Sequence, residues 1–89
     1  MTNVIMFGAE SFCASCVKLH PVFNEVSKLY PDIYFKYVDV ESDEGIDLSC
    51  EYTVRNVPTI IIIKNNEVVE RVCGTRTKDE LKNIIEKWK

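Results

Sequence analysis

The order of strand-like and helix-like segments constrains the fold of this chain more than any other feature of its sequence. Short runs rich in Val, Ile and aromatic residues predict strands, and apolar residues spaced three and four apart predict helices. Strands are predicted at 3–8, 33–40, 59–64 and 67–73, and helices at 13–30, 43–52 and 77–88. The order β-α-β-α-β-β-α predicts an α/β fold: a four-stranded mixed sheet, with two parallel strands and an antiparallel hairpin, flanked by helices on both faces.

Two short signals support the boundaries in the second half of the chain. Asn65 and Asn66 separate the last two predicted strands, and because Asn tolerates a positive φ they predict a hairpin turn. Thr77, followed three residues later by Glu80, has the pattern of a capping box, which predicts the start of the last helix. No repeat or linker interrupts this organisation, so we expect a single domain over residues 1–89.

Composition and charge exclude several classes of protein. Apolar residues make up 46% and charged residues 28% of the chain, which is typical of a folded protein rather than a disordered one. The net charge of −3 comes without a basic stripe, so we expect no nucleic-acid partner. The longest purely apolar run, the isoleucines at 60–63, is far shorter than the roughly 20 residues that cross a bilayer, and no leader pattern follows Met1. We therefore expect a cytoplasmic monomer without membrane association.

The chain has four cysteines, and two of them, Cys13 and Cys16, lie only three residues apart. A disulfide framework is typical of loop-rich secreted domains, whereas this chain has strong regular periodicity. In a reducing compartment, a Cys-x-x-Cys spacing indicates catalysis or metal binding instead. Zinc sites commonly use two such pairs, and the remaining candidates Cys50, Cys73 and His20 are scattered along the sequence. We therefore expect no metal site.

The place of the pair at the start of a predicted helix favours redox chemistry. Cys13 would stand in the first turn, where unpaired N–H groups and the positive end of the helix dipole favour a thiolate. Cys16 lies about one turn along the same face, near enough to form a disulfide with Cys13. The pair therefore supplies one sulfur to attack a disulfide and a second to release the mixed disulfide.

Further motifs follow the pair at characteristic separations. They are Pro21, Val38-Asp39-Val40, Val57-Pro58-Thr59 and Gly74. Together with a strand that leads into Cys13-Ala14-Ser15-Cys16 and a helix that follows it, they make the sequence resemble the thioredoxin family over residues 4–88. The form is a compact one that lacks the family's extra N-terminal strand and helix. A resemblance to glutaredoxins is weaker, because their Gly-Gly turn that holds glutathione is absent.

The resemblance implies a docking surface for protein substrates around Cys13. In the thioredoxin family the bond before the proline that matches Pro58 is cis, and it leaves the preceding backbone free to pair with an extended substrate segment. The substrate-binding residues would be Phe12, Val57, Pro58, Gly74 and Thr75. The family also implies that substrates are protein disulfides, that a thioredoxin-reductase-like enzyme or a low-molecular-weight thiol restores the dithiol, and that no cofactor is bound.

Two features depart from the family's pattern. Ala14 and Ser15 replace the Gly-Pro that commonly separates the two cysteines, which changes the redox potential of the pair. The family's buried Asp, a proton relay for the resolving cysteine, and its Lys partner fall near Met6 or Phe7 and near Tyr37. That relay is therefore missing, and another group or water has to deprotonate Cys16.

Structural roles are expected for the remaining chemistry-bearing side chains. Cys50 and Cys73 are expected as small buried hydrophobes, with a second disulfide or a third redox thiol as the alternative. His20 is expected on the surface of the first helix, and a role as a base four residues beyond Cys16 is the alternative.

Two functions are compatible with these observations. The leading hypothesis is a small thiol-disulfide oxidoreductase that reduces protein disulfides, in which Cys13 attacks and Cys16 resolves. The alternative is a thioredoxin-fold module that binds a protein partner, with the cysteine pair acting as a redox switch or inactive. The missing relay and the Ala-Ser linker favour this alternative.

Overall fold

The computed structural model describes all 89 residues and contains the seven elements in the predicted order. They are β1 (Thr2–Gly8), α1 (Ala14–Ser27), β2 (Tyr34–Asp39), α2 (Asp43–Glu51), β3 (Thr59–Lys64), β4 (Glu67–Cys73) and α3 (Lys78–Trp88). The predicted fold class is confirmed. The first helix differs most from its prediction, because it ends at Ser27 rather than at residue 30. The residues after Ser27 form a tighter turn, in which the Leu29 N–H donates to the Val26 carbonyl and the Tyr30 N–H donates to the Ser27 carbonyl. Pro31 follows directly and disfavours a longer helix.

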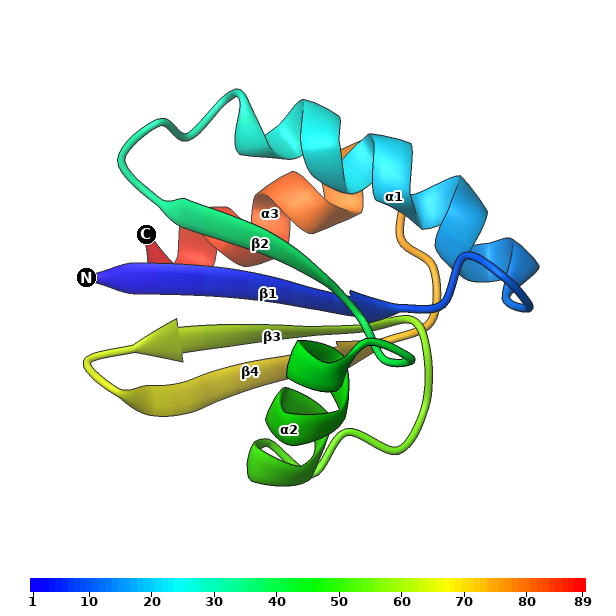
Figure 1. Ribbon diagram of the computed structural model, residues 1–89. Helices are drawn as coiled ribbons and strands as arrows, with labels where there is room; N and C mark the ends of the chain where they lie inside the picture. The colour runs from blue at the N-terminus through cyan, green and yellow to red at the C-terminus, as the bar shows by residue number, and fades with distance from the viewer.

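The four strands form one sheet in the order β2-β1-β3-β4. β1 runs parallel to β2, with α1 as the connection between them, and antiparallel to β3, which pairs with β4 as the predicted hairpin (Figure 1). Asn65 and Asn66 at the hairpin turn have φ values of 54° and 68°, as their tolerance of positive φ predicted. β1 and β3 are therefore the central strands, and the segment after β1 leads directly from the middle of the sheet into α1.

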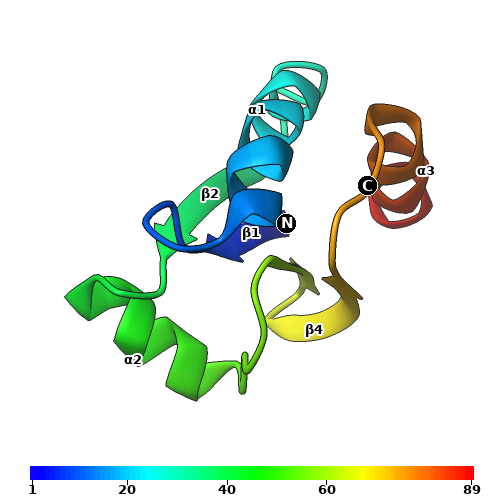
Figure 2. The ribbon, with the colours of Figure 1, turned by 90° about the vertical axis from the view of Figure 1, so that its right-hand side faces the viewer.

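Helices cover both faces of the sheet. Figure 2 shows α1 and α3 together on one face and α2 on the other. Alternate side chains of β1 point to opposite faces, so Val4 and Met6 pack beneath α1 and α3, whereas Ile5 and Phe7 pack on the side of α2. Because both faces are covered, the central strands are apolar at nearly every position, and β3 buries all four of its isoleucines.

The last helix begins as its capping box predicted. The Thr77 hydroxyl accepts a hydrogen bond from the Glu80 N–H at 3.1 Å, and the Glu80 carboxylate accepts one from the Thr77 N–H at 2.9 Å. At the other end of this helix, the Thr2 hydroxyl donates to the Trp88 carbonyl. Both termini of the chain thus lie at one end of the sheet, and the start of α1 lies at the opposite end (Figure 1).

No helix in the structure has both the length and the apolar character that crossing a membrane requires.

Candidate functional site

Cys13 is the N-cap of α1. The chain leaves β1 at Gly8, turns, and brings the Cys13 N–H back to the Ala9 carbonyl at 3.0 Å. Cys13 itself is extended, with φ −114° and ψ 99°, and its Sγ accepts a hydrogen bond from the Cys16 N–H at 3.2 Å. The first turn of α1 contains no acidic residue. This position sets the sulfur of Cys13 at the positive end of the helix, where a thiolate is stabilised.

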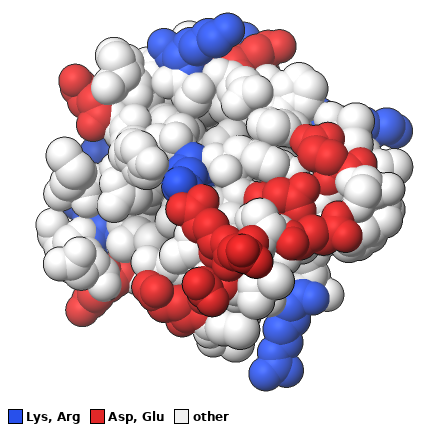
Figure 3. All heavy atoms as spheres, viewed as in Figure 1, with Lys and Arg blue, Asp and Glu red and all other residues white.

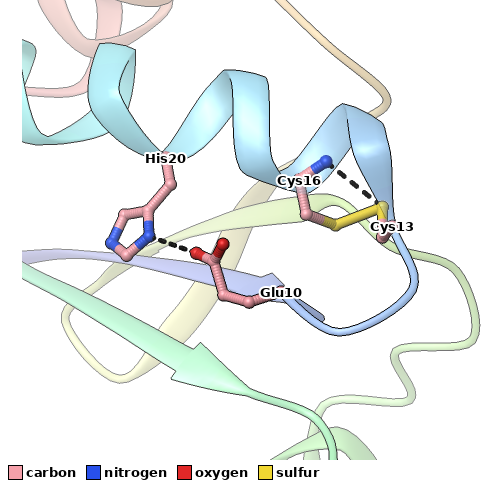
Figure 4. A network of polar contacts seen from close by, with 4 residues as sticks. All are labelled: Glu10, Cys13, Cys16 and His20. Carbon is pink, nitrogen blue, oxygen red and sulfur yellow. Dashed lines mark hydrogen bonds and ion pairs between the residues drawn. A yellow bond between two sulfur atoms is a disulfide. The ribbon is translucent and has the colours of Figure 1, made fainter.

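Cys13 and Cys16 are joined by a disulfide (Figure 4), and their Cα atoms lie 5.2 Å apart. The two residues differ in exposure, since Cys16 is wholly buried whereas Cys13 is partly exposed. Only Cys13 is therefore open to a large partner from outside. Cys16 can reach the sulfur of Cys13 from within the protein.

The segment before β3 lies against Cys13. The Val57 carbonyl oxygen is 3.9 Å from Cys13 Sγ, and the Val57–Pro58 peptide bond is cis. The Pro58 carbonyl in turn accepts a hydrogen bond from the Gly74 N–H at 2.9 Å. This hydrogen bond holds the turn after β4 close to the Val57-Pro58 segment. Gly74 has a φ of 85°, a backbone conformation that favours glycine.

A shallow apolar hollow extends from this segment toward α2. Its volume is about 370 Å³, and its lining includes Phe12, Val40, Ile46 and Val57. Phe12, next to Cys13, is 66% exposed, and Ile46 on α2 is 51% exposed. A larger hollow of about 600 Å³ lies at the other end of the sheet and contains none of the predicted site residues. The hollow of about 370 Å³ is therefore the relevant surface, because its lining includes Phe12, the neighbour of Cys13 in the chain, and Val57, whose carbonyl lies beside Cys13 Sγ.

Thr75, the last of the predicted substrate-binding residues, is exposed. Its carbonyl accepts a hydrogen bond from the Arg76 guanidinium at 2.8 Å, and the same guanidinium nitrogen lies 3.1 Å from the Cys73 carbonyl. Arg76 thus occupies backbone acceptors of this turn.

The prediction that Cys50 and Cys73 are buried is wrong, because both are free thiols on the surface. Cys50 stands on the outer face of α2, which packs on the sheet through Leu48. Cys73 ends the edge strand β4, where its sulfur lies 3.8 Å from the Thr59 hydroxyl. The high average burial of cysteine reflects its small apolar side chain, and it does not say which face of a short helix or edge strand a given cysteine occupies.

His20 is partly exposed on the surface of α1, as expected, but its ring has two partners there. Its ring stacks on the Tyr37 ring, with centroids 3.8 Å apart and an angle of 11° between the planes. Nδ1 of His20 lies 2.6 Å from Oε1 of Glu10, and this N–H donates to the carboxylate (Figure 4). We call Glu10, His20 and Tyr37 the polar cluster. The spacing of four residues between Cys16 and His20 is the sequence signal that places this cluster on the Cys16 side of α1.

Tyr37 contributes a buried hydroxyl to the polar cluster. Its hydroxyl is shielded from solvent and has no hydrogen-bond partner in the protein. Burial raises the pKa of Tyr37 to about 12, and the neighbouring carboxylates Glu10 and Asp39 act in the same direction. Tyr37 is therefore a neutral phenol at physiological pH.

Acidic side chains gather on the face where α2 begins (Figure 3). Asp43 and Glu44 lie in the first turn of α2, where their charges complement the helix dipole, and Glu41 precedes them. Nowhere in the structure do three or more His, Cys, Asp or Glu side chains come together in a way that could hold a metal ion.

Comparisons with known proteins agree with this geometry. A family model described as thioredoxin matches residues 2–87. Thioredoxin H5 of Oryza sativa subsp. japonica is 42% identical over 78 residues, which cover 88% of this chain and 56% of that protein. The X-ray structure of Fasciola hepatica thioredoxin superposes with a TM-score of 0.87 at 28% identity, covering 99% of this chain and 81% of that one.

A third match comes from a structure described as the basis of the thiol resolving mechanism in yeast mitochondrial 1-Cys peroxiredoxin via glutathione/thioredoxin systems. It has a TM-score of 0.83 at 27% identity and covers 97% of this chain and 77% of that one. The chain spans 56 to 61% of the length of the first three curated relatives that it matches.

Proposed function

Because this chain belongs to the thioredoxin family, we propose that it is a small thiol-disulfide oxidoreductase that reduces protein disulfides. One observation carries the proposal. A partly exposed Cys13 at the N-terminus of α1 is bonded to a wholly buried Cys16, and the Val57 carbonyl lies beside the exposed sulfur. This asymmetry gives one cysteine access to a substrate and keeps the other in reserve.

The reaction proceeds in two exchanges. The Cys13 thiolate attacks one sulfur of a substrate disulfide, a bond forms between these sulfurs, and the other substrate sulfur leaves as a thiolate. The Cys16 thiolate then attacks Cys13 Sγ, forms the Cys13–Cys16 disulfide and releases the second substrate thiolate. Two electrons have passed from the dithiol to the substrate, and an external reductant has to return them.

We propose that the substrate is an extended protein segment. Its backbone would pair with the backbone at Val57-Pro58, as an added strand. Its side chains would contact Phe12 and the apolar hollow. Gly74 and Thr75 would border the segment on the other side of Pro58. The description of the matched yeast structure concerns a peroxiredoxin, which supports proteins as substrates. The reductant is a thioredoxin-reductase-like enzyme or a low-molecular-weight thiol.

We further propose that the protein acts as a cytoplasmic monomer, as a single domain over residues 1–89, and without a bound cofactor. A dithiol that works as a reductant needs a compartment that keeps thiols reduced, which supports a cytoplasmic location. The chemistry needs only the two sulfurs and a reductant. Neither the geometry of the site nor the comparisons with known proteins add support to the alternative of a binding module with an inactive pair.

Reduction of insulin disulfides with dithiothreitol as the electron source tests the proposed function. Wild type is expected to accelerate the reaction, and Cys13→Ser is expected to abolish the acceleration. Cys73→Ser is the matched control, because it removes a free surface thiol of the same chain. If Cys13→Ser were as active as wild type, the proposed function would be wrong.

A further inference from the structure

The resolving step requires Cys16 to lose a proton inside the protein. A thiolate and not a thiol attacks the mixed disulfide, and a free thiol is mostly protonated near neutral pH. Cys16 has no exposed surface, so bulk water does not reach it directly. Efficient resolution therefore needs a proton acceptor close to the buried side of α1.

The polar cluster is the group of titratable side chains on that side. Cys16 and His20 are four residues apart in α1, so their Cβ atoms are neighbours at roughly 6 Å. Figure 4 shows both side chains leaving the same side of the helix, and the Glu10 carboxylate reaching toward that side from the loop after β1. Oε1 of Glu10 is held by His20 Nδ1 at 2.6 Å, and the carboxylate also lies near the Tyr37 hydroxyl, whose pKa it helps to raise. Its second oxygen can accept a proton.

β2 closes the cluster from the other side. The Tyr37 ring stacks on His20, and its buried hydroxyl finds no partner in the protein. Close packing fixes the ring, because a Cβ at Gly8 would come within 3.0 Å of the Tyr37 hydroxyl oxygen. A buried hydroxyl near a carboxylate is a suitable neighbour for a bridging water, which needs two to four polar partners.

We propose that Glu10, oriented by His20, accepts the proton of Cys16 through a bridging water during resolution. The proposal rests on the proposed dithiol exchange. The proton moves from Cys16 Sγ to the water and from the water to the free oxygen of the Glu10 carboxylate. The Cys16 thiolate then forms a bond with Cys13 Sγ, the substrate thiolate leaves, and Glu10 later returns the proton to solvent. His20 is a positioning residue in this scheme.

The charges that face Glu10 and His20 are few. Figure 4 shows Cys16 on the same side of α1 as His20, and from β2 Tyr37 stacks on His20 and has Asp39 near it. Tyr37 is unsuited to accept the proton, since it is already a neutral phenol, and it can only donate its O–H to the bridging water. Glu10 is the carboxylate in direct contact with the helix that carries Cys16.

Stopped-flow reduction of the aromatic disulfide dithiobisnitrobenzoate separates the two exchanges. Attack by Cys13 releases a first coloured thiolate at a rate that depends on the reagent concentration. Resolution by Cys16 releases a second one at a rate that does not. All variants carry Cys50→Ser and Cys73→Ser, because these exposed thiols react with the reagent. The test variant is Glu10→Gln, and the control is Glu41→Gln, which removes another exposed carboxylate, one that accepts a hydrogen bond from Ser11.

The proposal predicts an unchanged first phase in Glu10→Gln and a second phase slowed about 100-fold at pH 6 to 7, the low end of what a proton acceptor contributes. The deficit is expected to shrink as the pH approaches about 9, where solvent deprotonates the thiol without help. His20→Phe, which keeps a ring on Tyr37, is expected to slow the second phase less than Glu10→Gln does.

Three results would overturn the proposal. One is a second phase in Glu10→Gln as fast as in Glu41→Gln. Another is a slowing by the same factor at every pH, which would indicate a purely structural role for Glu10. The third is a parent protein without a concentration-dependent first phase, which would refute the proposed function itself and this inference with it.

Discussion

The two sulfurs of one disulfide lie in opposite surroundings. Cys13 faces outward at the end of α1, beside the exposed ring of Phe12 and the Val57 carbonyl. Cys16 faces inward, wholly buried, one helical turn from the polar cluster of Glu10, His20 and Tyr37. The outward side is suited to binding a partner, and the inward side to handling a proton. Dithiol exchange requires both an accessible sulfur and a protected one. The start of α1 provides the two within the four residues from Cys13 to Cys16.

The largest expected effect separates the roles of the two cysteines. Cys16→Ser keeps the attacking sulfur but removes the intramolecular thiol, so its mixed disulfide with a substrate should accumulate. Turnover in the insulin assay is expected to fall at least about 100-fold, because an external thiol has to replace a neighbour of very high effective concentration. Mass spectrometry of the trapped species identifies the cysteine that is bonded to substrate.

Cys13→Ser is the matched comparison for this trap. It is expected to form no mixed disulfide, because Cys16 is inaccessible from outside. If Cys13→Ser accumulated the adduct instead, the assignment of outward and inward sulfurs would be reversed.

The burial of the Tyr37 hydroxyl on the inward side should make the free energy of unfolding fall at alkaline pH. The pKa of Tyr37 is raised from 10.0 to about 12, chiefly by burial, so the folded protein keeps a proton that the unfolded chain loses. The stabilisation is complete below pH 10 and is lost as the pH rises from 10 to 12. For a ring that is partly exposed, we expect about 1 to 2 kcal/mol.

Urea unfolding of the oxidised protein at several pH values measures this loss. Tyr37→Phe should show a smaller decline between pH 10 and 12 than wild type. Tyr30 also has a pKa raised to about 12, through its hydrogen bond to Glu86, so it contributes to the decline in both proteins and Tyr30→Phe serves as the comparison. Equal declines in wild type and Tyr37→Phe would contradict the burial of the Tyr37 hydroxyl in the folded state.

The smallest expected effect concerns the outward side. Phe12→Ala removes an exposed ring beside Cys13, so KM for a protein substrate should rise about 3- to 10-fold, part of what burying an aromatic side chain contributes. Reduction of dithiobisnitrobenzoate should change little, because so small a disulfide does not need the apolar hollow. Leu29→Ala is the control, since Leu29 is a similarly exposed apolar residue far from the cysteines. Equal KM values for both variants would show that the hollow does not bind substrate.

The outward side could be predicted well from the sequence, and the inward side could not. The Cys13-Ala14-Ser15-Cys16 motif lies next to a strand and opens a helix, so its position follows from local pattern alone. The capping box at Thr77 and the Asn65-Asn66 turn are equally local, and the structure confirms both.

The polar cluster depends instead on three elements that are distant in sequence. Glu10 comes from a loop, His20 from α1 and Tyr37 from β2, and only the parallel pairing of β1 with β2 brings them together. The spacing along α1 predicts the surface position of His20, but it does not reveal the ring of Tyr37 that stacks on it from β2. Cys50 and Cys73 were misplaced for a related reason, since their exposure depends on which face of α2 or β4 meets the core.

Alkylation of the fully reduced protein tests the asymmetry of the two cysteines most directly. A limiting amount of iodoacetamide at neutral pH, followed by peptide mass spectrometry, gives the relative rates of all four thiols. The account predicts that Cys13 reacts fastest, that the exposed thiols Cys50 and Cys73 follow, and that the buried Cys16 reacts last. A Cys13 that reacts no faster than Cys50 and Cys73, or a Cys16 that reacts as fast as Cys13, would contradict it.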